Sequence, residues 1–62
     1  MALDLILKMG LIKSDTEIII RDKDFHVVAQ GNWYQYCILG YAYADIESFT
    51  WQDDNKLFID LK

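Results

Sequence analysis

The sequence predicts a small two-layer α+β domain, in which two antiparallel hairpins form one sheet and two short helices cover one face. One segment alternates apolar and polar residues with the period of two expected of half-buried strands, a second is rich in β-branched residues, and each contains a polar turn. Two other segments carry helix-forming residues and end at a glycine. The expected order is helix, strand, strand, helix, strand, strand, in a single domain of residues 1–62.

The first helix is expected over residues 2–9, where Asp4 and Lys8 have the i,i+4 spacing of a helical ion pair and Gly10 ends the helix. The apolar residues exceed the single stripe that a surface helix needs, so either the following loop or another protein covers the excess. The side chains expected to face the sheet are Leu3, Ile6 and Leu7, and the additional ones are Leu5, Met9, Leu11 and Ile12.

The first hairpin is expected to contain strands over 16–21 and 25–30, joined by a turn at Asp22-Lys23-Asp24. A two- or four-residue loop pairs Ile20 with Val27, whereas a three-residue loop pairs Ile20 with His26. We prefer the first register. It gathers Ile18, Ile20, Val27 and Ala29 on one face.

The second helix is expected over residues 33–39. Asn32 and Gln35 have the spacing of a capping box, and Gly40 is suited to end the helix. Its predicted inner face carries Trp33, Cys37 and Ile38, with help from Tyr34.

The second hairpin, over residues 49–61, has the clearest alternation in the chain. A three-residue loop with Asn55 in the left-handed conformation pairs Phe49 with Ile59 and Trp51 with Leu57. These four residues then share one buried face. Ile46 fits this pattern only if the strand begins after it or contains a bulge near Glu47-Ser48. The opposite sheet face, predicted to remain open, carries Ile19, Thr50 and Phe58.

Composition limits the possible functions. A chain of 62 residues builds only a thin core, yet 53% of its residues are hydrophobic, so some apolar side chains are expected to contact a protein partner or a second copy. The net charge of −4 disfavours direct binding to nucleic acid. The apolar run 2–9 is too short to span a bilayer, lacks a basic leader, and contains two charges. A single cysteine cannot form an internal disulfide, which fits a reducing compartment, so a cytoplasmic location is expected.

No pattern of catalysis, metal binding or cofactor binding stands out. His26 and Cys37 could form a base and a nucleophile, but no orienting partner accompanies them, so a strand-edge histidine and a small core thiol are the expected roles. The two acidic turns lack the glycine and distal glutamate of a calcium loop, and the glycines are too scattered to hold phosphate. We expect a protein that is not an enzyme and has no cofactor.

The aromatic segment 33–43 is the most unusual in composition. No lysine or arginine occurs between Lys23 and Lys56, which argues against stacking of nucleic-acid bases and favours a protein interface. The alternative is that these rings cover the core. The predicted partner-binding residues are Trp33, Tyr34, Tyr36, Tyr41 and Tyr43, together with Asp53 and Asp54 of the acidic turn.

A resemblance to other proteins rests on four segments of the sequence. They are TEIIIRD at 16–22, GNW at 31–33, SFTW at 48–51 and LFIDL at 57–61. In these motifs the chain resembles short uncharacterised α+β proteins of phages and integrated elements of Gram-positive bacteria. The resemblance implies a phage-related setting, in which some proteins of similar size and acidity are anti-CRISPR or other anti-defence inhibitors. It supplies no functional residue.

Two classes of function follow. The first is an inhibitor or adaptor that binds another protein, such as a nucleic-acid-binding protein whose basic groove attracts the acidic turns. The second is a self-associating accessory protein whose apolar surface is used in a homodimer.

Overall fold

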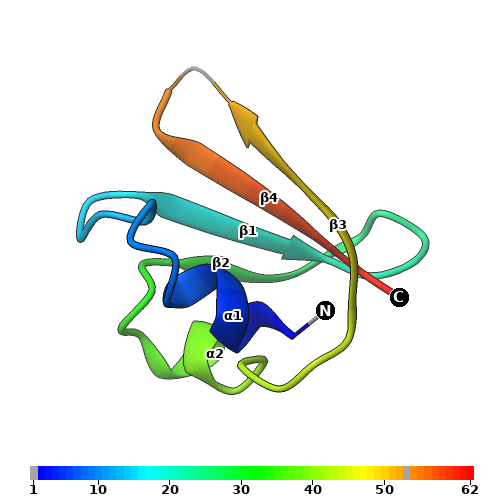
Figure 1. The fold of residues 1–62 in the computed structure, drawn as a ribbon. Helices are drawn as coiled ribbons and strands as arrows, with labels where there is room; N and C mark the ends of the chain where they lie inside the picture. The colour runs from blue at the N-terminus through cyan, green and yellow to red at the C-terminus, as the bar shows by residue number, and fades with distance from the viewer. Residues whose placement is uncertain (1, 53) are drawn as a thin grey trace.

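The computed structural model describes residues 2–52 and 54–62 and confirms the predicted order of elements. Two short helices lie on one face of a four-stranded sheet (Figure 1). The elements are α1 (Leu3–Leu7), β1 (Glu17–Arg21), β2 (Val27–Gly31), α2 (Tyr36–Leu39), β3 (Ile46–Gln52) and β4 (Lys56–Leu61).

The strand order is β2-β1-β4-β3. Each hairpin is antiparallel, and the two hairpins are joined by parallel pairing of β1 with β4, in which Ile18 lies beside Leu57 and Ile20 beside Ile59. The connection through α2 carries the chain from one edge of the sheet to the other. The sheet is therefore mixed, and its central strands come from opposite ends of the sequence.

The predicted register of the second hairpin is confirmed. Phe49 pairs with Ile59, Trp51 pairs with Leu57, and Asn55 has a left-handed φ of 58°. Leu57 and Ile59 are completely buried and Phe49 packs against them, whereas Trp51 at the end of the strand stays 39% exposed. Turn length and side-chain period agree here, which explains why the register was predictable.

Of the two alternatives for Ile46, the structure shows the bulge near Glu47-Ser48, and β3 begins at Ile46 itself. Ile46 pairs with Leu61 and Ser48 with Asp60, so Glu47 is the additional residue. The extra residue turns Ile46 into the core, where it packs with the buried cluster.

Both registers considered for the first hairpin are wrong. Ile20 pairs with Ala29 rather than with Val27 or His26, and a bulge at Val28 separates this pair from Arg21 and Val27. Val27 is consequently 56% exposed instead of buried. Two features cause this: a longer turn over residues 22–26, within which Phe25 adopts a left-handed φ of 64°, and the bulge at Val28, which puts Val27 opposite Arg21.

Both helices are shorter than predicted. In α1 the ion pair between Asp4 and Lys8 forms at 2.9 Å, but the helix ends at Leu7. α2 starts at Tyr36 because the Asn32 side chain does not cap it and instead donates hydrogen bonds to backbone carbonyl oxygens of the loop before β1. None of the described residues belongs to a helix long and apolar enough to cross a membrane.

The core lies between the helices and the sheet. Of the predicted inner residues of the second helix, only Ile38 is buried, whereas Trp33, Tyr34 and Cys37 are exposed, because α2 makes a single turn. The fully buried apolar side chains are Leu3, Ile6, Ile18, Ile20, Ile38, Leu57 and Ile59.

Among the described residues, no helix covers the other sheet face (Figure 1), as predicted, but Ile19 on that face is only 4% exposed because neighbouring side chains cover it. The Arg21 guanidinium donates to both carboxylate oxygens of Asp60, at 2.7 and 3.1 Å. It also lies over the rings of Phe58 and Phe25, at 4.6 and 5.2 Å from their centroids. Bidentate pairing and ring stacking suit the planar guanidinium, so this face is filled locally instead of open.

Candidate protein-binding surface

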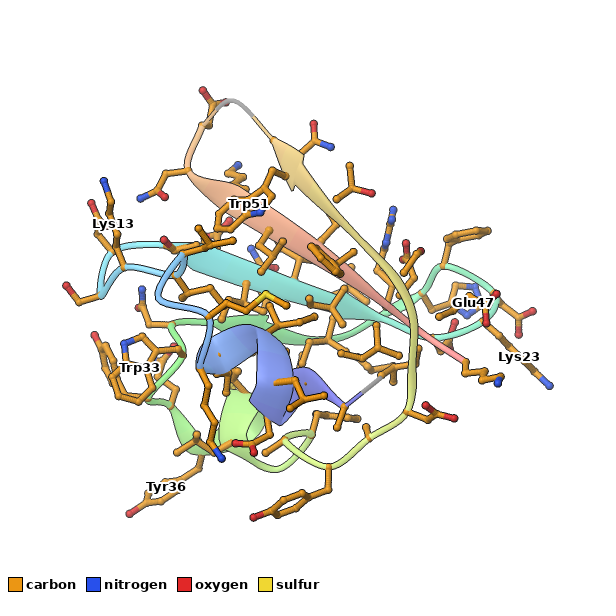
Figure 2. The ribbon with its side chains drawn as sticks, viewed as in Figure 1. Lys13, Lys23, Trp33, Tyr36, Glu47 and Trp51 are labelled. Atoms are coloured by element: carbon orange, nitrogen blue, oxygen red, sulfur yellow. The ribbon has the colours of Figure 1, made fainter. Side chains whose placement is uncertain are left out.

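The aromatic segment lies mostly in solvent on the helical side of the molecule. Tyr36, the first residue of α2, is 92% exposed, and Tyr43, in the turn after α2, is 88% exposed. Figure 2 shows Tyr36 pointing away from the body of the protein. Tyr41 differs, because it is partly buried against the core. The interpretation that the rings cover the core therefore holds for Tyr41 and fails for Tyr36 and Tyr43.

Trp33 and Tyr34 precede α2 and stack edge to face, with ring centroids 5.8 Å apart and planes at 87°. Their loop is fixed from both sides. The Gln35 side-chain oxygen accepts the N–H of Asn32 at 2.6 Å, and the Asn32 amide donates to the carbonyl oxygen of Ser14 at 3.0 Å. These bonds hold the two exposed rings in place and so lower the entropy that they would lose on binding.

Gly31 makes this loop possible. A Cβ atom at this position would overlap the Gln35 side-chain oxygen that holds the N–H of Asn32. The glycine therefore allows the close approach that orients Trp33 and Tyr34.

An apolar groove of about 370 Å³ runs between α1 and α2. The Asp4–Lys8 ion pair lies along it, and the hydrogen bond and charge of Asp4 raise the pKa of Lys8 above its ordinary value. The groove is lined by Asp4, Leu7, Lys8, Ile12, Trp33 and Leu39. Most of its wall is hydrophobic, as is typical of sites that accept an apolar side chain.

The turn after α2 lies against the start of α1, because the backbone N–H of Asp4 donates to the carbonyl oxygen of Ala42 at 2.8 Å. This contact places Tyr43 in the same layer as the groove. We define the helical surface as the exposed apolar side chains of this layer. They are Leu5, Met9, Leu11, Trp33, Tyr34, Tyr36, Leu39 and Tyr43.

Of the predicted acidic residues, Asp54 does not join this surface. Asp54 is exposed in the turn between β3 and β4, on the far side of the molecule from α2 (Figure 1), and Asp53 lies outside the described residues. The expectation that aromatic residues and this acidic turn lie close together is therefore wrong for Asp54. Sequence reasoning also missed Leu39, whose i,i+3 spacing from Tyr36 was the available signal for an outward-facing position.

His26 and Cys37 do not form a pair. Cys37 is exposed, so the expected core thiol is wrong, and its Sγ lies 3.6 Å from the carbonyl oxygen of Gln30. His26 lies in the first hairpin turn, where it joins Asp22 and Asp24 in a group whose potential ligand atoms are within 4.8 Å of one another. Asp22 Oδ1 accepts the backbone N–H groups of Asp24 and His26, at 2.8 and 3.0 Å, and therefore serves the turn.

No protein-family model, curated protein or solved structure matches this chain.

Proposed function

We propose that this chain is a small protein-binding domain that inhibits or adapts another protein through the helical surface. Its resemblance to small phage and mobile-element proteins supports a bacterial cytoplasmic setting and makes an anti-CRISPR-like inhibitor part of this proposal. The observation that carries the proposal is the exposure of Tyr36 and Tyr43, two large rings held in solvent on the helical side of the molecule, which also carries an apolar groove.

Tyrosine and tryptophan dominate the energetics of many interfaces because they bury a large area while losing few rotors. The groove gives a place for an apolar anchor of the partner, and the exposed rings on the same side add area that a partner can bury. Nucleic acid is a poor fit to this surface, since the lysine that lines the groove is paired with Asp4.

The test is affinity capture from a bacterial lysate with the parent protein and with Tyr36→Ala/Tyr43→Ala. The double variant is expected to fold normally and to lose the captured protein. Val27→Ala, a truncation of an exposed residue on β2, is the matched control and should retain it. Equal capture by all three proteins would contradict the proposed surface.

A further inference from the structure

Beyond the bulge at Glu47, the outer edge of β3 carries little protection against pairing with another strand. β3 forms one edge of the sheet, and neither helix lies beside it (Figure 1). The isolated bridge between Ala2 and Asp45 stops one residue before the strand begins. Monomeric proteins usually block such edges with charges, proline or a cover, but residues 48–52 contain no charge and no proline.

Phe49 and Trp51 direct their backbone groups to this edge. Alternate residues of a strand point their N–H and C=O groups to opposite sides. The Asn55 carbonyl accepts the N–H of Glu17, at the start of β1, at 3.0 Å, so odd-numbered residues of β4 point to β1 and even-numbered ones to β3. The even-numbered residues pair with Gln52, Thr50 and Ser48. Within the described chain, the backbone N–H and C=O groups of Phe49 and Trp51 therefore point outward, away from β4.

We propose that β3 pairs antiparallel with β3 of a second copy of this chain, about a twofold axis at Thr50. In this register Phe49 lies opposite Trp51 of the second copy, and each such pair exchanges two backbone hydrogen bonds. The segment is self-complementary, because its paired residues are uncharged and its aromatic side chains meet on the helical side. The pairing also covers Trp51, which is 39% exposed in the single chain. A twofold axis at Phe49 would instead bring the Glu47 bulge into the ladder.

The pairing joins two four-stranded sheets into one continuous sheet, with the twofold axis perpendicular to it. Both helical layers then lie on the same side, so the dimer presents two copies of the helical surface to a partner. This inference goes beyond the proposed function and does not depend on it, because the self-pairing edge and the helical surface use different residues.

The experiment uses charge at Thr50, an exposed residue that faces its own copy at the twofold axis. Directly opposed residues in such a pair have Cα atoms about 4.5 Å apart, so Thr50→Glu or Thr50→Lys places two like charges together. Sedimentation equilibrium measures the mass of the parent and of each variant, and circular dichroism checks folding. The matched controls are Gln30→Glu and Gln30→Lys, at an exposed position of the other edge strand, β2.

The parent is expected at twice the 7.3 kDa mass of the single chain. Each Thr50 variant alone should raise the dimer dissociation constant at least about tenfold, an equimolar mixture of the two should restore the dimer, and the Gln30 variants should remain dimeric. The proposal is overturned by a parent that stays monomeric up to about 1 mM, by folded Thr50 variants that dimerise like the parent, or by dissociation of the Gln30 variants.

Discussion

At the residue scale, Asn55 combines two properties that fix the second hairpin. Its φ of 58° is a conformation that most side chains resist, and its side-chain oxygen accepts a hydrogen bond from the buried Thr16 hydroxyl at 2.9 Å. The turn is therefore tied to the start of β1, and one residue serves both local geometry and a long-range contact.

Replacing Asn55 separates these two contributions. Asn55→Gly keeps the left-handed backbone and loses the hydrogen bond, which costs about 1 kcal/mol. Asn55→Ala loses both the hydrogen bond and the tolerance for the left-handed backbone, and should lower the free energy of unfolding by about 2 kcal/mol or more. Urea unfolding measures the difference. If the two variants were equally stable, the backbone conformation of Asn55 would contribute nothing measurable.

Ile59 tests the core. It is completely buried at the centre of β4 and pairs with Phe49 on one side and Ile20 on the other. Ile59→Ala should cost about 2 to 5 kcal/mol, which could exceed the whole stability of so small a domain. Thermal unfolding is the measurement, with Val27→Ala as the exposed control. A midpoint lowered by only a degree or two would contradict this core assignment.

Asp22 tests the first turn through pH. The N–H of His26, followed by that of Asp24, lowers the pKa of Asp22 below its ordinary 3.8. A carboxyl with a lowered folded-state pKa contributes stability above its unfolded pKa and loses that contribution as pH falls through the folded value. Asp22→Asn keeps an oxygen acceptor but removes the titration. Its unfolding midpoint should therefore vary less with pH below about 4 than that of the parent, a difference visible in paired acid titrations.

At the element scale, the sequence predicts well where local signals agree. The second hairpin was predictable because side-chain alternation, loop length and the tolerance of Asn55 for the left-handed conformation all give one register. The first hairpin was not, since the turn in which Asp22 accepts two backbone N–H groups pairs Arg21 with Val27, and the bulge at Val28 then places Ile20 beside Ala29. The net shift from the preferred pairing is two residues, from Val27 to Ala29, which keeps Ala29 on the same face as Ile20, so side-chain alternation cannot reveal it.

The pairing of strands from different hairpins could not be predicted from the sequence, because local patterns carry no information about it. No local pattern indicates that β1 lies parallel to β4, and therefore none predicts that Arg21 meets Asp60. The helical surface was predicted in part: the aromatic composition indicated an interface, but only the structure separates the exposed Tyr36 and Tyr43 from the core-packed Tyr41. In α2, a single turn leaves too few residues for the periodicity to assign the faces of the helix.

At the scale of the whole molecule, the exposed and core-packed tyrosines should respond differently to truncation. Tyr36→Ala or Tyr43→Ala should weaken partner binding by roughly tenfold or more with little change in stability, as expected for interface anchors. Tyr41→Ala should lower stability instead, because Tyr41 packs against the core. Calorimetric binding and thermal unfolding of the same variants distinguish the two effects. Normal binding by both exposed-tyrosine variants would move the interface away from these rings.

Salt concentration should affect the proposed dimer and partner binding differently, because the charges involved lie in different places. Each chain carries a net charge of −4, so two copies repel and added salt should strengthen the dimer. Asp54 instead lies on the far side of the molecule from the helical surface, so Asp54→Asn should change the rate of partner association little, and only at low salt, where charges act over more than about 10 Å. Sedimentation across a salt series measures the first effect, and stopped-flow mixing with the captured partner measures the second. A dimer that weakens as salt rises would mean that complementary charges hold it, which conflicts with pairing through the uncharged segment 48–52.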